Sequence, residues 1–327
     1  MQMPLVGFGL WKVPKDSCAD TVYTALKTGY RLLDGACDYG NEKEAGEGLK
    51  RAIADGIVKR EEVCDHHHQG KNHVRRDGNA ALIDQLQLWN TFHKREHVHA
   101  AVKKQLADWG VDYFDLYLIH FPVSLAYVDP AHRYPPEWFG DDGKVYLQNT
   151  PIQETWEAME EVLDAGLAKD IGVSNFNGSL ICDLLRYAKR PVSALQVEHH
   201  PYLTQDPLIK FAQSQGIAVT GYSSLGPAGW LEIGMHHKVP SLFETEPITS
   251  IAQAVGKSPA QVLLRWATQR NVAIVPKSNS TERAAENLAS SGFDLTQEQL
   301  EQISALNQNI RLNNPGEGID QRLSIFA

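Results

Sequence analysis

Polar and titratable side chains recur directly after short apolar runs of this 327-residue chain. Asp34 and the pair Asp38-Tyr39 follow one run, and His120-Phe121 follows another. Carboxyl, phenol and imidazole groups can transfer protons between enzyme and substrate. Any one of these groups could be structural, but their repetition at one end of nearly every run favours an active site. The other runs end in Ser174-Asn175, Glu198-His199-His200, Tyr222-Ser223-Ser224 and Lys277-Ser278-Asn279.

Apolar runs of strand length alternate with amphipathic stretches of helical length, which predicts parallel strands joined by crossover helices. In a (β/α)8 barrel, reactive groups collect at the carboxyl ends of the strands, so the polar groups above would share one site. The predicted strands are Val6–Trp11, Arg31–Ala36, Tyr113–His120, Asp170–Asn175, Ala194–His199, Ala218–Ser224 and Ala273–Ser278. The predicted helices are Ala19–Thr28, Glu42–Asp55, His97–Trp109, Ile152–Ala165, Ser179–Ala188, Pro207–Gln215 and Pro259–Gln269, with further capped starts at Ser258-Pro259 and Thr281.

An eighth strand, third in chain order, is needed to complete this barrel. The gap for it lies between Asp55 and His97, where seven of the 13 histidines fall between residues 66 and 99. Residues 64–79 show no strand pattern, so we predict one barrel domain over residues 1–327 whose third strand is replaced by an atypical insertion at 64–87. Ser124–Thr150, rich in Pro, Gly and Asp, is predicted to be a long loop.

Composition narrows the class of protein. The chain is 43% apolar and 22% charged with a net charge of −9, which argues against a nucleic-acid or membrane-surface partner. Four cysteines without a paired motif, together with no signal or spanning segment, predict a cytoplasmic protein. Neither GxGxxG nor GxxxxGK[ST] occurs, so a Rossmann domain or a P-loop is not expected.

Several long motifs occur in a fixed order and resemble the aldo-keto reductases, in particular their fungal NAD(P)H-dependent D-xylose reductases. The resemblance covers roughly residues 4–63 and 88–327. It implies reduction of a small open-chain aldose, such as D-xylose to xylitol, with NADPH or NADH, by a monomer or homodimer. The motifs are Gly7-Phe-Gly-Leu-Trp-Lys12, Asp34-Gly-Ala-Cys-Asp-Tyr-Gly-Asn-Glu42, Leu118-Ile-His-Phe-Pro122, Gly172-Val-Ser-Asn-Phe176, Gln196-Val-Glu-His-His-Pro-Tyr202 and Ile274-Val-Pro-Lys-Ser-Asn279.

By this resemblance Tyr39 is the acid that protonates the carbonyl oxygen, and His120 orients that oxygen. A tyrosine has an ordinary pKa near 10, and the family lowers it with a lysine that is held by the aspartate matching Asp34. Taken alone, Asp34 could be a helix-capping carboxylate and His120 a core histidine. The residues that match the sugar pocket are Trp11, Asp38, His120, Phe121 and Asn313.

The resemblance also assigns the cofactor site. The nicotinamide carboxamide is matched by Ser174, Asn175 and Gln196, and its ring by Tyr222. Glu232 matches a carboxylate that can bind the ribose hydroxyls of NADH, which implies use of both cofactors. The other cofactor positions are Ser223, Leu225 and Gly226, the adenosine-phosphate group Lys277, Ser278, Asn279 and Arg283, and the adenine contacts Glu286 and Asn287.

The chain departs from the family pattern at the catalytic lysine. That position, directly before Leu88-Trp89, is Gln87. A neutral amide cannot stabilise a tyrosinate by charge, so we expect a rate loss of roughly 10²–10⁴-fold. Lys43 or Lys71 could substitute for the missing ammonium, although nothing in the sequence places either one at the site.

Two hypotheses account for the insertion. Cys64, Asp65 and His66–His68 are metal-ligand types, but no second ligand cluster accompanies them, so we expect no metal. A translated intron or gene-model error fits the abrupt loss and return of the family pattern better. The competing functions are a non-catalytic nucleotide-binding homologue and a reductase of other aldehydes.

Overall fold

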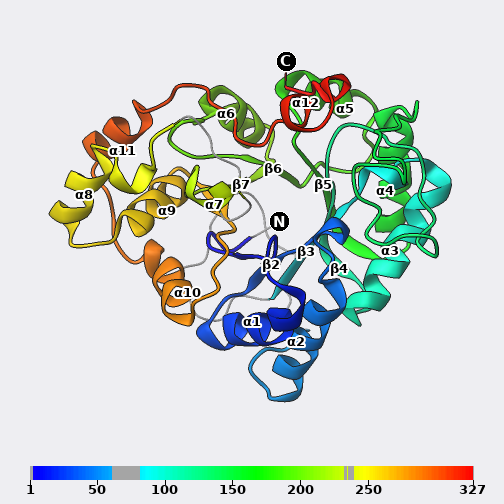
Figure 1. Cartoon of the computed structure of the whole chain (residues 1–327), viewed down its shortest axis with the longest axis horizontal. Coiled ribbons are helices and arrows are strands. Elements are labelled where there is room, and N and C mark those ends of the chain that lie inside the picture. Colours follow the sequence, from blue (N-terminus) through cyan, green and yellow to red (C-terminus); the bar gives the residue numbers. More distant parts are fainter. Residues whose placement is uncertain (1–2, 61–81, 232–233, 235–238, 327) are drawn as a thin grey trace.

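The computed structural model describes residues 3–60, 82–231, 234 and 239–326. Eight parallel strands pair in chain order, and most are followed by helices that lie outside the sheet. Figure 1 shows these helices as a ring around the strands. The strands are β1 (Phe8–Gly9), β2 (Leu32–Asp34), β3 (Ile83–Leu88), β4 (Phe114–Ile119), β5 (Ala168–Ser174), β6 (Ala194–Glu198), β7 (Ala218–Tyr222) and β8 (Val272–Ile274).

The two edges of the sheet meet next to β1. Val6 forms a parallel bridge with Ile274, and the Gly7 amide donates to the Ile274 carbonyl over 2.7 Å. Gly9 permits this close approach, because a Cβ there would lie 2.5 Å from the carbonyl oxygen of Val275. The predicted (β/α)8 barrel is therefore confirmed.

The helices cover the outer face of the barrel. Seven of them match the predicted helices to within a few residues, and the predicted caps are present: Ser258 forms a capping box with Gln261, and Ser280 caps the helix that begins at Thr281. The helices are α1 (Lys15–Thr28), α2 (Glu42–Ala54), α3 (Arg95–Trp109), α4 (Ile152–Asp164), α5 (Gly178–Tyr187), α6 (Asp206–Ser214), α7 (Ala228–Leu231), α8 (Ile248–Val255), α9 (Pro259–Gln269), α10 (Thr281–Leu288), α11 (Gln297–Ser304) and α12 (Pro315–Gly318).

The prediction that residues 64–87 replace the third strand is wrong for their last five residues. Ile83–Leu88 form β3, which pairs with β2 at Leu32–Asp34 and with β4 along Leu116–Ile119. The strand is buried throughout although it carries Asp84, Gln85 and Gln87. Buried polar groups are stabilised by partners: the amide groups of Gln85 and Gln87 donate to Asp34 and Gln196, and Asp84 forms an ion pair with Arg60. Residues 64–81, with Cys64 to His68 and Lys71, lie outside the described residues.

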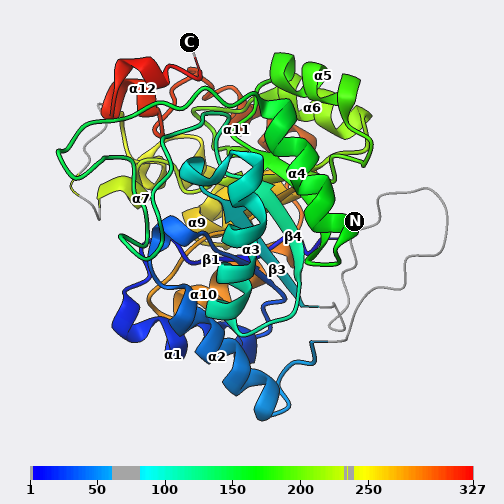
Figure 2. The same ribbon diagram turned by 90° about the vertical axis from the view of Figure 1, so that its right-hand side faces the viewer.

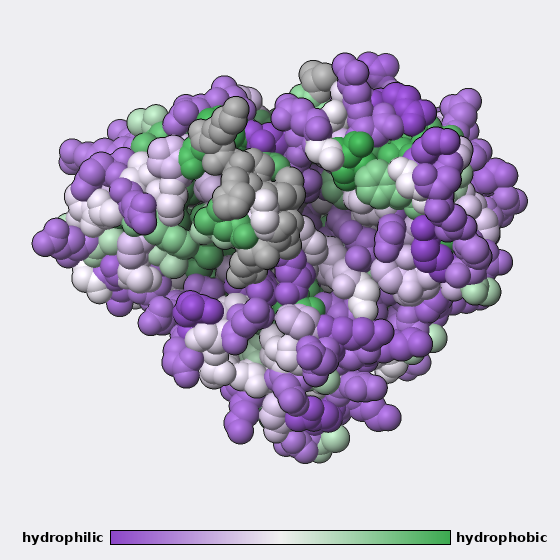
Figure 3. All heavy atoms as spheres, viewed as in Figure 1, coloured by the Kyte–Doolittle hydropathy of each residue, from purple (hydrophilic) through white to green (hydrophobic). Residues whose placement is uncertain are grey.

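The segment Ser124–Thr150 is an irregular loop, as predicted, with one isolated bridge between Leu125 and Leu147. Leu125 and Val145 pack on Leu323 near the carboxyl terminus, so this loop and the C-terminal segment support each other. Figure 2 shows the C-terminus and α12 at the upper edge of the molecule, and α1 and α2 at its lower edge. Hydrophilic residues cover most of the face seen in Figure 3. No described helix has the length and apolar character needed to cross a membrane.

Candidate active site

A cavity of about 950 Å³ opens at the carboxyl ends of the strands. Most of the residues proposed from the sequence line this one cavity, although they come from every part of the chain. They are Trp11, Asp34, Asp38, Tyr39, His120, Phe121, Asn175, Gln196, Tyr222, Ser223, Leu225, Gly226, Lys277, Ser278, Asn279, Arg283, Glu286, Asn287 and Asn313. Of the strand-end groups, Asp34, Asp38, Tyr39, His120, Phe121, Asn175, Tyr222, Ser223, Ser224, Lys277, Ser278 and Asn279 line the cavity, whereas Ser174, Glu198, His199 and His200 do not. The other positions in the list were assigned by the resemblance.

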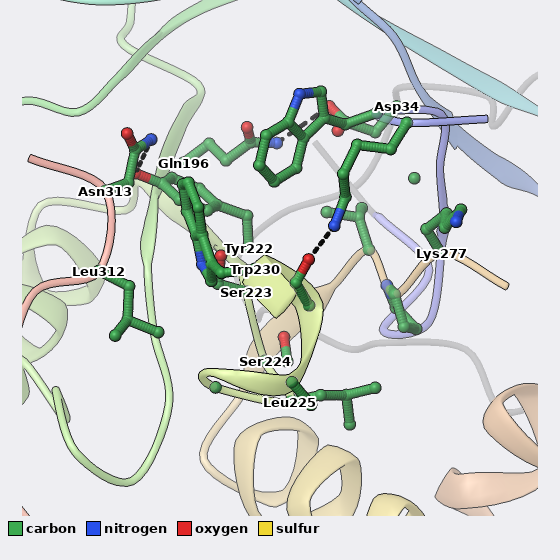
Figure 4. Close-up of a pocket in the computed structure, with 18 of the residues that line it drawn as sticks. Asp34, Gln196, Tyr222, Ser223, Ser224, Leu225, Trp230, Lys277, Leu312 and Asn313 are labelled. Carbon is green, nitrogen blue, oxygen red and sulfur yellow. Dashed lines mark hydrogen bonds between the residues drawn. The ribbon is translucent and has the colours of Figure 1, made fainter. Parts of the chain in front are cut away.

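Three glutamine amides surround the buried carboxylate of Asp34 at the end of β2. Gln85, Gln87 and Gln196 donate through Nε2 to its Oδ1 at 2.7, 3.2 and 3.0 Å. Figure 4 shows the contact between Gln196 and Asp34. Gln87 also donates to Oε1 of Gln196 at 3.0 Å. The structure therefore places Gln87 beside Asp34, where the resemblance expects a lysine.

This neutral environment changes the acidity of the site. Burial raises the pKa of Asp34 to about 6, and the hydrogen bonds from the three amides oppose that rise. Tyr39, at the end of the short helix Cys37–Tyr39, has a pKa well above its ordinary value. Burial is the main cause, and the negative charges of Asp34 and Asp38 add to it. Tyr39 is therefore a protonated but weak acid.

His120 and Asp38 face each other beside Tyr39. His120 Nδ1 lies 3.4 Å from Asp38 Oδ1, and the rings of His120 and Tyr39 meet edge to face with centroids 6.2 Å apart. Burial, with a contribution from His93, lowers the pKa of His120 to about 3, while burial raises the pKa of Asp38 to about 8. At neutral pH the imidazole is uncharged and can donate one hydrogen bond, and Asp38 is largely a neutral acid.

A chain of amide and hydroxyl contacts forms the next part of the wall. Asn175 donates through Nδ2 to the His120 carbonyl at 2.9 Å, and Tyr222 donates to Asn175 Oδ1 at 2.7 Å. Asn313 Nδ2 lies 3.2 Å from the Tyr222 hydroxyl, as Figure 4 shows. Ser174 is fully buried, contacts Asn175 Nδ2 at 3.1 Å and does not line the cavity.

The far end of the cavity carries cations and a helix start. Lys277 follows β8 and Arg283 lies in the first turn of α10, whose N-terminal end attracts negative charge. Ser278 Oγ contacts both the amide and the carbonyl of Ser280, which fixes the turn between them. A lysine, an arginine and a helix N-terminus together suit a phosphate.

Backbone conformation is unusual at three cavity residues. Lys12, Asn175 and Ser223 adopt left-handed conformations with φ of 65°, 63° and 54°. Such conformations are costly for residues other than glycine and concentrate at functional sites. At Asn175 and Ser223 the turn comes directly after a strand, so it aims both residues into the cavity.

Sequence reasoning missed several residues of the wall. Trp230 of α7 packs edge to face on Trp11 with centroids 5.0 Å apart, and Trp138 of the long loop packs in the same way on Phe121 at 5.0 Å. Neither lies at a strand end or in one of the motifs that carry the resemblance, so neither signal could find them. Lys43 is exposed on α2 and does not line the cavity, and Glu232 lies outside the described residues.

The fold is an eight-stranded α/β barrel, and one cavity holds the titratable groups Tyr39 and His120 together with the cations Lys277 and Arg283. This is the architecture of a barrel enzyme. The model of the Aldo/keto reductase family matches residues 5–308, and the chain belongs to this family. It is 56% identical over 316 residues to a protein of Aspergillus clavatus named "Probable NAD(P)H-dependent D-xylose reductase xyl1", covering 96% of this chain and 90% of that protein. It is 52% identical over 315 residues to the NAD(P)H-dependent D-xylose reductase of Aspergillus niger, covering 96% and 93%. Among solved structures, the aldose reductase from Schistosoma japonicum matches with a TM-score of 0.80 and 33% identity, covering 96% of this chain and 92% of that one.

Proposed function

We propose that this chain catalyses NAD(P)H-dependent reduction of an open-chain aldose, D-xylose to xylitol, with a rate limited by Gln87. The observation that carries this proposal is the single cavity that joins Tyr39 and His120 to Lys277 and Arg283. The names of the Aspergillus relatives support the substrate and the cofactors. We further propose a cytoplasmic monomer or homodimer.

The residues present fit a nicotinamide nucleotide. Tyr222 offers an aromatic face, Asn175 and Gln196 offer amide groups, and Lys277 and Arg283 offer positive charge at the other end of the cavity. The same charges would favour the extra phosphate of NADPH. When bound, the nicotinamide supplies the hydride.

The chain's own residues manage the carbonyl oxygen. His120 is neutral because burial lowers its pKa to about 3, so it can donate a hydrogen bond that orients this oxygen. Tyr39 donates its hydroxyl proton to the developing alkoxide. Every group that shifts the pKa of Tyr39 raises it, so the tyrosinate left behind is poorly stabilised and the transfer is slow. Trp11 and Phe121 exclude water from the apolar part of the cavity.

The test is steady-state oxidation of NADPH and NADH with D-xylose, with xylitol identified as the product. We expect slow turnover by the chain as it stands. Gln87→Lys places an ammonium beside Asp34 and Tyr39, which lowers the pKa of both, and we expect a gain in kcat of about 10²-fold or more. Gln87→Met, which matches the length without the charge, is the control and should give no gain.

The specific observation of Gln87 beside Asp34 also favours a second candidate, a non-catalytic nucleotide-binding homologue. Tight NADPH binding by both the chain and Gln87→Lys, without D-xylose-dependent oxidation by either, would support this candidate and overturn the reductase. Faster turnover of aliphatic aldehydes than of D-xylose would instead change the substrate class.

A further inference from the structure

Glu198, the last residue of β6, is a fully buried carboxylate behind the cavity wall. Its Oε1 accepts a hydrogen bond from the backbone amide of Leu312 at 2.7 Å, and its Oε2 accepts one from the amide of Asn313 at 2.9 Å. His200 Nε2 lies 2.7 Å from the same Oε1. The strand-end pattern predicted this group in the shared site, but it does not line the cavity, and the mechanism above gives it no role.

Both backbone contacts fall on the segment that carries Asn313 into the cavity. Leu312 and Asn313 lie in an irregular stretch between α11 and α12, so they have no hydrogen bonds of a helix or sheet of their own. Arg311, directly before them, contacts Gln205 Oε1 at 3.2 Å, and Gln205 in turn donates to the Glu198 carbonyl. The end of β6 is thus the attachment point of residues 311–313.

These contacts close a ring with the cavity wall. Glu198 pairs in register with Tyr222 of the neighbouring strand β7. The Tyr222 hydroxyl accepts the Asn313 amide at 3.2 Å and donates to Asn175 at 2.7 Å. The position of the Asn313 side chain is therefore defined on one side by Glu198, through the backbone, and on the other by Tyr222.

We infer that Glu198 is a positioning residue that fixes residues 311–313 so that Asn313 presents its amide to the substrate, and that it thereby sets the affinity for hydroxylated aldehydes. This inference rests on the proposed function, in which Asn313 binds a sugar hydroxyl. Glu198 itself does not line the cavity and acts only through the segment that it holds.

Holding the amides of Leu312 and Asn313 together requires a carboxylate at position 198. Two oxygens can accept from two backbone N–H groups at once, whereas a glutamine of the same shape has one acceptor and one donor. Glu198→Gln therefore keeps the volume but turns an N–H donor toward the Leu312 or the Asn313 amide. Glu198→Asp keeps both acceptors on a shorter side chain and should have the smaller effect.

The experiment compares the parent, Glu198→Gln and Glu198→Asp in the Gln87→Lys background, where turnover is expected to be measurable. For Glu198→Gln we expect the KM for D-xylose to rise about tenfold, the loss of one well-placed hydrogen bond. The KM for propanal, which has no hydroxyl for Asn313, the Kd for NADPH and kcat should each change by less than about threefold. Amide hydrogen exchange at Leu312 or Asn313 should become faster by at least about tenfold.

Glu160→Gln is the matched control. Glu160 is also a buried carboxylate that accepts two backbone amides, those of Lys189 and Arg190 at 2.6 and 2.8 Å, but it does not line the cavity or touch residues 311–313. Both amides bind the same oxygen, Oε1, which a glutamine can keep as its acceptor, so Glu160→Gln should leave the ratio of the two KM values and amide exchange at Leu312 and Asn313 unchanged. In a double-mutant cycle, Glu198→Gln should add little to the KM of Asn313→Ala, since both act through the same amide.

Additive effects in that cycle, an equal rise in both KM values, or unchanged amide exchange would each overturn the inference. Absence of D-xylose turnover from every variant would instead contradict the proposed function. In that case, faster amide exchange at Leu312 or Asn313 in the Glu198 variants alone would support the attachment of residues 311–313 to Glu198. Unchanged exchange would overturn it.

Discussion

Buried carboxyl groups dominate the electrostatics around Tyr39. Burial raises the pKa of Asp34 to about 6, that of Glu42 to about 7 and that of Asp38 to about 8. A carboxyl group whose pKa is higher in the folded than in the unfolded chain binds its proton more tightly when folded. Its contribution to stability is therefore full at low pH and is lost as the pH rises through the folded-state value.

Asp38→Asn tests this directly. The asparagine amide does not titrate. The parent loses stability as the pH rises from the ordinary Asp38 pKa of 3.8 to its folded-state value of about 8, and the variant does not. We expect the free energy of unfolding of the variant, relative to the parent, to increase from pH 4 to pH 8, as measured by urea denaturation without cofactor.

Asp142→Asn is the control for the pH series. Asp142 is exposed, and hydrogen bonds from Tyr146 and Lys144 lower its pKa, so this substitution should have a small effect in the opposite direction. A difference between parent and Asp38→Asn that stays constant across the pH range would contradict a raised pKa for Asp38.

At the scale of elements, β3 begins in a buried charge cluster at the opposite end from the cavity contacts. Arg60 lies 3.3 Å from Asp84 and 2.7 Å from Asp115, and it packs over the Tyr113 ring at 4.3 Å. Lys169 Nζ lies 3.2 Å from Asp115 and 4.0 Å from the centroid of the same ring. The cluster joins β3 to β4 and β5 and so holds the strand that carries Gln85 and Gln87.

Arg60→Ala removes the only cation within ion-pair distance of Asp84 among the described residues. An uncompensated buried charge costs about 3–5 kcal/mol, and we expect a loss of this order in urea denaturation at pH 8. The loss should be smaller at pH 5, where Asp84, whose pKa is already raised to about 6, takes up a proton. Arg51→Ala, which breaks the exposed pair with Asp20, should leave the free energy of unfolding nearly unchanged at either pH.

The sequence predicted seven strands and the cavity residues at their ends because apolar runs and the polar residues that follow them are local signals, and the family resemblance supplied the other wall positions. It failed at β3 because Asp84, Gln85 and Gln87 interrupt the apolar pattern of that strand. Their partners are Arg60, which forms an ion pair with Asp84, and Asp34 and Gln196, which accept from the glutamine amides; all three are distant in sequence. Trp138 and Trp230 were missed for a related reason, since only tertiary packing brings an irregular loop and a short helix to the wall.

For the whole molecule, cofactor binding should appear as added stability. A ligand present at one hundred times its Kd stabilises the folded state by about 2.7 kcal/mol, so NADPH and NADH should each raise Tm. In the double variant Lys277→Ala/Arg283→Ala we expect most of the NADPH shift to be lost and the NADH shift to remain, because only NADPH carries the extra phosphate.

The control for this measurement is Lys103→Ala/Arg186→Ala, which removes the same two charges from exposed positions on α3 and α5. It should leave both shifts unchanged. Equal losses for the two cofactors in Lys277→Ala/Arg283→Ala would mean that these cations do not discriminate between them.

The contact between Val6 and Ile274 has a consequence for biosynthesis. At about 5–20 residues per second, on the order of tens of seconds separate the synthesis of these two residues. Throughout that interval the nascent sheet carries an unpaired edge, whose free backbone groups can recruit other chains. Ribosome stalling or premature termination before β8 would therefore yield an aggregation-prone fragment rather than a smaller barrel, and nascent chains of this protein should depend on chaperones until β8 has left the ribosome.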